Sequence, residues 1–451
     1  MLRRALVAFV LITAFASRAD AVPSFAAQTG QPCQTCHIGS FGPQLTPFGR
    51  EFKIEGYTMT GGEGLAPKIP LSAMTIGSFT NTGASQPEGA APHFGTNNNF
   101  AVDQVSLFFA GRITDFAGAF VQGTYSGTNR AFSLDNTDFK LTTPLSLDDT
   151  ELRIGISINN GPTVQDPFNS TPVWMFPFAS SALAATPTAQ TLLGGRQLVG
   201  NSLGVTAYGW YDRRLYLEAG GYGTYGPTLL SWTGNALGPG STANIAPYVR
   251  AAYEWQWSDQ AAHIGGLLLS ANINPAISAF SANTSQGRNT YTDYGVDAGY
   301  QWLSDPSIVG AYVLYVHEDQ NLKASVATGN SSQPSNALNQ LNANTSYFWR
   351  NTYGLTLGWQ YAWGNANPLL YPPAPVTGSA NGKPNSNAFT IEADWIPFGK
   401  EDSWLRPLAN LKIGLQYTIY TQFNGGNKNY DGFGRNASGN NTLFLYAWMA
   451  F

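Results

Sequence analysis

The amino-acid sequence predicts an all-β fold, a transmembrane antiparallel β-barrel of about 16 strands. Three observations predict it. Only 11% of the 451 residues are charged, whereas soluble domains usually carry about 25%. From residue 68 to residue 451, segments of alternating polarity follow one another. The spacers between these segments are alternately short and long, which is typical of a barrel with tight turns at one end and long loops at the other.

The chain begins with a segment typical of a secretory signal peptide, predicted over residues 1–21. Arg3 and Arg4 provide a positive start, Ala5–Phe15 is apolar, and residues 19–21 (ADA) offer a cleavage site of the small-x-small type. A retained membrane anchor is the alternative, but the apolar run is short for a helix that spans a bilayer. Export together with a barrel predicts the outer membrane of a Gram-negative bacterium.

Four strand pairs are joined by spacers of a few residues. The pairs are 100–113 with 116–127, 198–211 with 215–225, 246–257 with 261–274, and 291–303 with 308–318. Long spacers follow at residues 81–99, 161–196, 226–242 and 321–344. We therefore predict periplasmic turns and extracellular loops, with both chain ends in the periplasm.

About fifteen strands are clear, and a weak sixteenth is predicted within residues 368–376. An even number is required because residues 395–408 look like a periplasmic turn and both termini lie on one side. The prolines within Leu369–Pro375 argue against a strand there, so 14 strands are the alternative. The segment Leu443–Phe451 alternates and ends in Phe, which is similar to the closing strand of outer-membrane proteins.

Charge and cysteine content exclude several classes of partner and site. The net charge is −4, and no basic stripe is present to meet phosphates, so no nucleic-acid partner is expected. Membrane lipid is the partner expected for the outer face of the barrel. Two cysteines are too few for a disulfide framework or a cysteine-rich zinc site.

Both cysteines lie before the barrel, within residues 22–67, in the motif Cys33-Gln34-Thr35-Cys36-His37. This is the C-x-x-C-H pattern of c-type haem attachment. Thiols three residues apart can each bond one vinyl group of the porphyrin, and the following imidazole is then held beneath the iron. A thioredoxin-type pair would need a βαβ context, and a zinc site would need two more nearby ligands. The motif predicts one covalent haem c, anchored by Cys33 and Cys36, with His37 as proximal iron ligand.

The second iron ligand has three candidates near this region, Met59, Met74 and His93. Met74 is favoured, because it begins the first strand and could point into the barrel toward a haem. The alternative is that Met74 is a strand residue facing lipid. His263 and His317 lie on predicted strands and are expected to be residues of the barrel wall.

Residues 22–67 are predicted to form a monohaem cytochrome c domain, with the barrel over residues 68–451. About 46 residues are marginal for an independent fold without further support. Docking into the barrel lumen would complete the core of this domain. The sequence therefore predicts that the haem domain plugs the lumen.

The residues around the motif resemble a known family. Pro23–Gly30 (PSFAAQTG) precedes the motif, and Leu45–Lys53 (LTPFGREFK) and Gly56–Thr58 (GYT) follow it. These segments resemble the fused monohaem cytochrome–porin family, whose best-known members are outer-membrane iron oxidases of iron-oxidising bacteria. The resemblance implies electron transfer from an extracellular donor, most plausibly Fe(II), to a periplasmic cytochrome or copper protein. It also implies that Cys33, Cys36 and His37 bind the haem.

A second function belongs to a different class, a diffusion porin whose haem domain is a structural plug or gate. Neither function requires a general acid, a general base or a nucleophile, and none is evident. No cluster of paired carboxylates marks a docking site for iron, and Glu88 and Asp431 are isolated acidic residues in predicted loops.

Overall fold

The computed structural model describes residues 23–61, 70–405 and 409–451. The predicted signal peptide (1–21) and the predicted domain boundary at residues 67–68 lie outside the described residues. Within the described ranges, no helix has the length and apolar character needed to span a bilayer.

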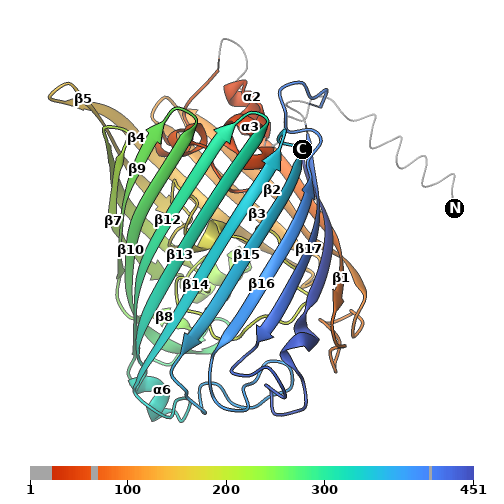
Figure 1. The fold of residues 1–451 in the computed structure, drawn as a ribbon. Coiled ribbons are helices and arrows are strands. Elements are labelled where there is room, and N and C mark those ends of the chain that lie inside the picture. The colour runs from red at the N-terminus through yellow and green to blue at the C-terminus, as the bar shows by residue number, and fades with distance from the viewer. Residues whose placement is uncertain (1–22, 62–69, 406–408) are drawn as a thin grey trace.

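A closed antiparallel β-barrel forms the body of the protein, as predicted (Figure 1). Its wall has 16 strands. They are β1 (Leu71–Thr82), β2 (Asn99–Thr114), β3 (Ala117–Ser126), β4 (Ala131–Leu147), β5 (Thr150–Asn159), β6 (Ser202–Tyr211), β7 (Leu215–Thr224), β9 (Ala246–Trp257), β10 (Gln260–Ser278), β12 (Asn289–Ser304), β13 (Ser307–Asn321), β14 (Ser335–Trp349), β15 (Tyr353–Gly364), β16 (Ser386–Trp395), β17 (Asn410–Gln422) and β18 (Thr442–Ala450). Strand β1 closes the barrel by pairing with both β2 and β18. The short β8 (Gly240–Thr242) and β11 (Ser281–Ala282) pair with the end of β10.

Side chains along the wall strands alternate between the lumen and the outer surface. In β6, Ser202, Gly204 and Thr206 are buried, whereas Leu203 and Val205 on the outer face are 49% and 51% exposed. Exposed aromatic side chains at the strand ends form a belt that includes Trp257, Trp302, Trp349, Tyr353 and Trp395. An apolar outer surface with an aromatic belt on a closed barrel is the architecture of an outer-membrane protein.

The two ends of the barrel differ, as the spacing of the strands predicts. At one end, which we call the turn end, turns of two or three residues join the strands, for example Ser258-Asp259 between β9 and β10. The exception is the connection from β16, which ends at Trp395, to β17, which begins at Asn410. At the opposite end, the loop end, most connections are long, although only residues 127–130 join β3 to β4. The C-terminus and the N-terminal helices both lie at the turn end (Figure 1).

The predicted strand number is correct, but the predicted sixteenth strand is not a strand. Residues 368–376 form turns in the loop between β15 and β16. The three prolines at 372, 373 and 375 lack backbone N–H groups and cannot complete a ladder. The long spacer predicted over 321–344 is also shorter than expected, because β14 already begins at Ser335.

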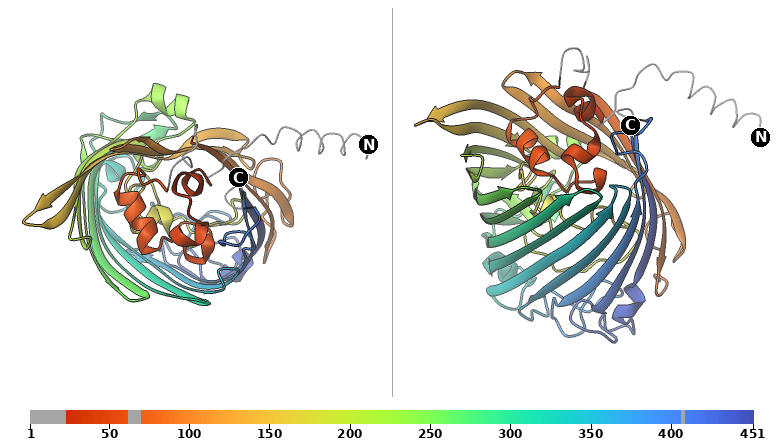
Figure 2. Two further views of the ribbon diagram at one scale, coloured as in Figure 1. Left: turned by 90° about the horizontal axis from the view of Figure 1, so that it is seen from above. Right: turned by 45° about the horizontal axis from the view of Figure 1, so that its top comes forward.

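Four short helices near the N-terminus lie inside the barrel at its turn end (Figure 2). They are α2 (Pro23–Thr29), α3 (Cys33–Cys36), the 3-10 helix η1 (Ile38–Ser40) and α4 (Pro47–Ile54). Helix α4 begins where Pro47 follows Thr46, whose hydroxyl accepts the backbone N–H of Gly49 at 3.2 Å. The remaining short helices are α5 (Pro227–Thr233), α6 (Lys323–Ala327), η2 (Pro172–Trp174) and η3 (Ala437–Asn440).

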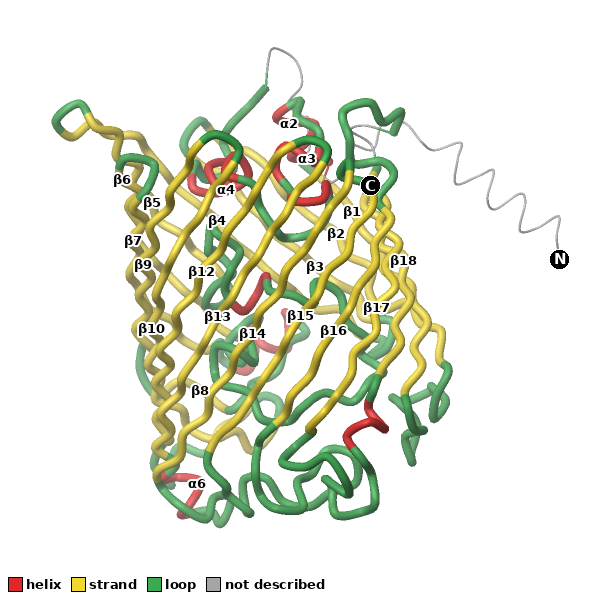
Figure 3. The backbone as a smooth tube through the Cα atoms, in the orientation of Figure 1, coloured by secondary structure: helices red, strands yellow, loops and turns green. Residues whose placement is uncertain are grey.

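Residues 160–201, between β5 and β6, fold into the lumen (Figure 3). We call this segment the inward loop. The sequence predicted an extracellular loop here, and that placement is wrong. The physical reason is its apolar content, since Val164, Phe168, Phe176, Leu183 and Leu192 are all buried. The inward loop reaches the opposite wall, where Asn342 on β14 donates to the Phe176 carbonyl at 2.7 Å and Gln416 on β17 to the Ala179 carbonyl at 3.2 Å.

Candidate functional site

The C-x-x-C-H segment forms one helical turn inside the barrel. Helix α3 covers Cys33–Cys36, and His37 follows it by donating its backbone N–H to the Cys33 carbonyl at 2.8 Å. Residues three apart share a helix face. Accordingly, Cys33, Cys36 and His37 all line the same cavity.

Helix α4 packs directly on this turn, and a glycine makes the close approach feasible. A Cβ atom added to Gly49 would lie 2.3 Å from the Cys36 carbonyl oxygen. The backbone N–H of Thr46 donates to the same carbonyl at 3.0 Å. Helix α4 and the preceding Thr46 therefore hold the motif turn in place through the Cys36 carbonyl.

The cavity beside the motif has a volume of about 680 Å³, within the range of roughly 300–1,000 Å³ usual for sites of small ligands and cofactors. Its wall near the motif is largely aromatic, formed by Phe25, Phe41, Phe52, Phe108, Phe120 and Trp448. Farther toward the loop end, neutral polar side chains such as Gln104, Gln360 and Gln416 line it. The aromatic part of the cavity, next to the motif, suits a flat hydrophobic cofactor.

The ionisable groups of the motif are shifted by burial. Burial lowers the pKa of His37 to about 4, with a small opposing effect of the Gly42 backbone. The imidazole is thus neutral at pH 7, the form that binds metals. Its Nδ1 atom is buried and makes no well-formed hydrogen bond with the described residues. Burial, and secondarily the neighbouring Cys33, raises the pKa of the Cys36 thiol to about 12, unlike the lowered values of redox-active pairs.

Met74 faces the lumen, so the alternative of a lipid-facing residue is excluded. Its side chain is buried, lines the cavity, and packs with Phe25 of α2 and Phe108 of β2. The Nε1–H of Trp448 donates to its Sδ atom at 3.1 Å. The other two candidates for a second iron ligand, Met59 and His93, do not line this cavity, and His93 is exposed in the loop between β1 and β2.

The two remaining histidines belong to the barrel wall, as predicted. His263 faces the lumen from β10 and packs against Phe168 of the inward loop, with ring centroids 4.8 Å apart. His317 on β13 contacts Asn339, with 2.8 Å between Nδ1 and Oδ1. Neither lines the cavity.

Buried charges join the N-terminal helices to the wall and to the inward loop. On α4, the Nε–H of Arg50 donates to Glu254 of β9 at 3.1 Å, and Lys53 donates to the Val164 carbonyl at 2.9 Å. The hydroxyl of Tyr57 donates to Asp138 of β4 at 2.7 Å. These contacts fix the helical segment against two separate partners.

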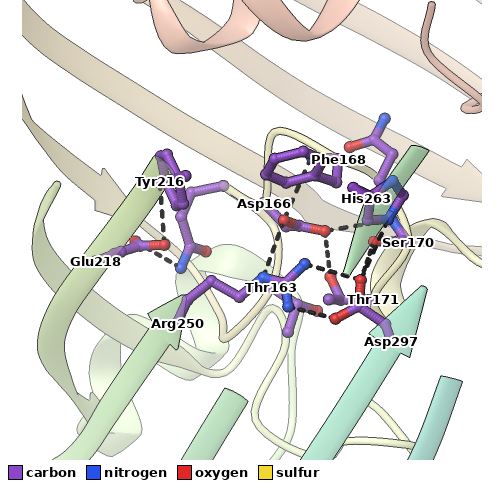
Figure 4. Close-up of polar contacts among 12 residues, drawn as sticks. Thr163, Asp166, Phe168, Ser170, Thr171, Tyr216, Glu218, Arg250, His263 and Asp297 are labelled. Carbon is purple, nitrogen blue, oxygen red and sulfur yellow. Dashed lines mark hydrogen bonds and ion pairs between the residues drawn. The ribbon is translucent and has the colours of Figure 1, made fainter. Parts of the chain in front are cut away.

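A second polar cluster anchors the inward loop (Figure 4). Arg250 on β9 makes two hydrogen bonds with Asp297 on β12, one of them 2.9 Å long, and its Nε atom lies 3.4 Å from Asp166 of the inward loop. Ser170 donates to Asp297 at 2.6 Å, and Thr171 donates to Asp166 at 2.8 Å. In this buried cluster Arg250 faces two carboxyl groups, and the Nε2 atom of His263 lies 3.4 Å from Asp297.

Sequence reasoning missed Trp448 and Met175, which both line the cavity. The alternation of the last strand contains the signal for Trp448, because Phe444, Tyr446 and Trp448 share one face. No comparable signal marks Met175, whose position depends on the path of the inward loop.

The two isolated acidic residues considered for iron docking do not form such a site. Asp431 is buried and accepts the backbone N–H groups of Phe433 at 2.8 Å and Arg435 at 3.1 Å. Glu88 is exposed in the loop between β1 and β2. Among the described residues, no group of three or more His, Cys, Asp or Glu side chains is arranged to hold a metal ion.

Neither a family model nor a curated protein matches the chain. Several solved outer-membrane proteins are similar to its barrel. OmpT of Vibrio cholerae is 9% identical with a TM-score of 0.42, covering 84% of this chain and 96% of that one. The channel DcaP of Acinetobacter baumannii is 12% identical with a TM-score of 0.45 (84% and 96%), and OmpF of Salmonella typhi is 11% identical with a TM-score of 0.44 (84% and 97%).

Proposed function

We propose that this porin-like outer-membrane barrel is an electron-transfer protein that carries one covalent haem c in its lumen. Cys33 and Cys36 would anchor the haem, and His37 would be the proximal iron ligand. The electron donor would be extracellular, most simply Fe(II), which is left as Fe(III). The acceptor would be an oxidised periplasmic cytochrome or copper protein, which approaches the turn end.

The observation that carries this proposal is the shared cavity of the C-x-x-C-H turn. Both thiols and the imidazole line one chamber of cofactor size with aromatic walls. The imidazole of His37 is neutral, which is the form that binds metals, and its buried Nδ1 atom lacks a well-formed hydrogen bond. When bound, haem c supplies a one-electron redox couple, which the side chains of this site do not have by themselves.

We further propose Met74 as the distal iron ligand, because it is buried in the same chamber. Replacement of Met74 by Ala is expected to lower the midpoint potential, since a thioether ligand raises the potential relative to other axial ligands. A redox titration with absorbance detection measures this shift. Met175→Leu is the matched control, since Met175 lines the cavity but packs with the inward loop and β10. An unchanged potential in Met74→Ala, or an equal shift in Met175→Leu, contradicts the assignment.

The second candidate function is a diffusion porin, which the barrel itself favours. Barrels with 16 strands usually enclose an aqueous channel, and neutral polar side chains line much of this cavity. Against it, the N-terminal helices and the inward loop both occupy the lumen (Figures 2 and 3). Electrons can cross such a filled barrel, whereas solutes of nutrient size would be obstructed.

Mixing the purified, haem-loaded protein with Fe(II) in a stopped-flow spectrometer separates the two functions. Electron transfer predicts rapid reduction of the haem together with low solute flux when the protein is placed in liposomes. Slow or absent reduction with fast solute flux favours the porin. The measurement is made on the full chain, because the N-terminal helices are held by contacts with the wall.

A further inference from the structure

The indole of Trp448 contacts the one sulfur atom that we propose as distal ligand. Its Nε1–H donates to Met74 Sδ at 3.1 Å. Both side chains are lumen-facing and line the cavity. A thioether sulfur is a weak hydrogen-bond acceptor, so an indole that donates to the buried Met74 sulfur is a specific arrangement.

The contact bridges the two strands that close the barrel. Trp448 lies on β18 and Met74 on β1, and these strands pair with Ile76 opposite Trp448 and Met74 opposite Ala450. The indole also packs edge-on against Phe41, with ring centroids 5.0 Å apart. Because Phe41 is four residues after His37, Trp448 contacts both Met74 and the segment that follows the C-x-x-C-H motif.

A thioether sulfur has two lone pairs, so it can bind iron with one and accept the indole N–H with the other. The hydrogen bond has two expected effects. It limits rotation of the Met74 side chain and so keeps the sulfur available to the iron. It also withdraws electron density from the sulfur, which disfavours the oxidised iron more than the reduced iron.

We propose that Trp448 is a positioning residue that holds and tunes Met74 as distal haem ligand. This inference rests on the proposed function, since it requires both the haem and its ligation by Met74. It makes the closing strand of the barrel part of the redox site. The two strands that close the barrel, β1 and β18, would then also influence the reduction potential of the haem.

The test compares Trp448→Phe with Tyr446→Phe in the full, haem-loaded protein. Tyr446 lies two residues away on the same face of β18, so its variant reports damage to the strand alone. Trp448→Phe is expected to lower the midpoint potential in a redox titration and to weaken the absorbance band of thioether-ligated ferric haem. Binding of added imidazole is expected to tighten by about fivefold, the factor supplied by one net hydrogen bond.

The outcomes separate this inference from the function on which it rests. Wild-type protein without covalent haem overturns the proposed function. A haem whose spectrum is insensitive to Met74→Ala overturns the ligand. When Met74→Ala changes the spectrum but Trp448→Phe leaves both the potential and the imidazole affinity at wild-type values, the positioning role is wrong. Equal changes in Tyr446→Phe and Trp448→Phe likewise overturn it, because they reflect the strand rather than the indole.

Discussion

A protein in which Cys33 and Cys36 are both replaced by Ala will contain no covalently bound haem. Each thiol is expected to form one thioether bond, and the chain has only these two cysteines. No other residue can take their place. The expected effect is therefore complete loss of the haem signal, measured by a pyridine haemochrome assay after expression with the cytochrome maturation machinery.

The control for this substitution is Thr35→Ala, which alters the same helical turn but leaves the motif intact. It is expected to retain full haem content. Strand content, measured by circular dichroism, is expected to stay unchanged in both proteins, because the barrel wall closes through β1 and β18 without the motif. Wild-type protein that remains colourless under the same conditions would falsify the haem assignment itself.

The barrel was predictable because its signal is local. In each wall strand, lipid and lumen impose opposite demands on neighbouring residues, so the alternation in β6 or β18 can be read directly from the sequence. The final strand and most of the long connections were found in this way. The prolines at 372, 373 and 375 correctly argued against a strand, since that segment is a loop. The error lay in requiring a strand there to reach an even number.

The inward loop was not predictable from its own residues. Its buried apolar side chains are scattered among small polar residues without a helix or strand period, so the sequence alone does not show whether the segment extends into water or crosses a lumen. Its position depends on partners that are distant in sequence, such as Arg250 and Asn342, which lie on strands 80 or more residues further along the chain. Contacts of this kind leave no periodic pattern.

In the candidate site, too, some residues could be predicted from the sequence and others could not. Cys33, Cys36 and His37 are recognisable because their spacing alone dictates the chemistry. Met74 could be proposed from sequence, but whether it faces lipid or lumen depends on strand register. The alternation of β18 places Trp448 on the lumen face, but its contact with Met74 follows only from closure of the barrel, because the two residues are 374 positions apart in sequence.

The second large effect is expected at Arg250, the cation that anchors the inward loop. Replacement by Leu removes the guanidinium that Asp166 and Asp297 share, and the side chains of all three residues are fully buried. Removing one partner from a buried ion pair typically costs about 3–5 kcal/mol. The loss is local to this anchor, because the contacts of the inward loop with Lys53, Asn342 and Gln416 remain.

Loosening of the inward loop next to β9 and β12 is expected to widen the lumen there, so Arg250→Leu is expected to raise the conductance in planar bilayers several-fold and to lower the unfolding temperature in detergent. Arg250→Lys keeps the charge but loses the paired hydrogen bonds to Asp297, so an intermediate effect is expected.

Arg213→Leu is the control, because its ion pair with Glu51 is half-exposed at the turn end and contributes about 1 kcal/mol or less. A conductance that stays low in Arg250→Leu while the unfolding temperature falls shows that the N-terminal helices alone close the barrel. Unchanged values of both quantities contradict the anchoring role, and the closure of the lumen must then be attributed to packing of the apolar side chains of the loop.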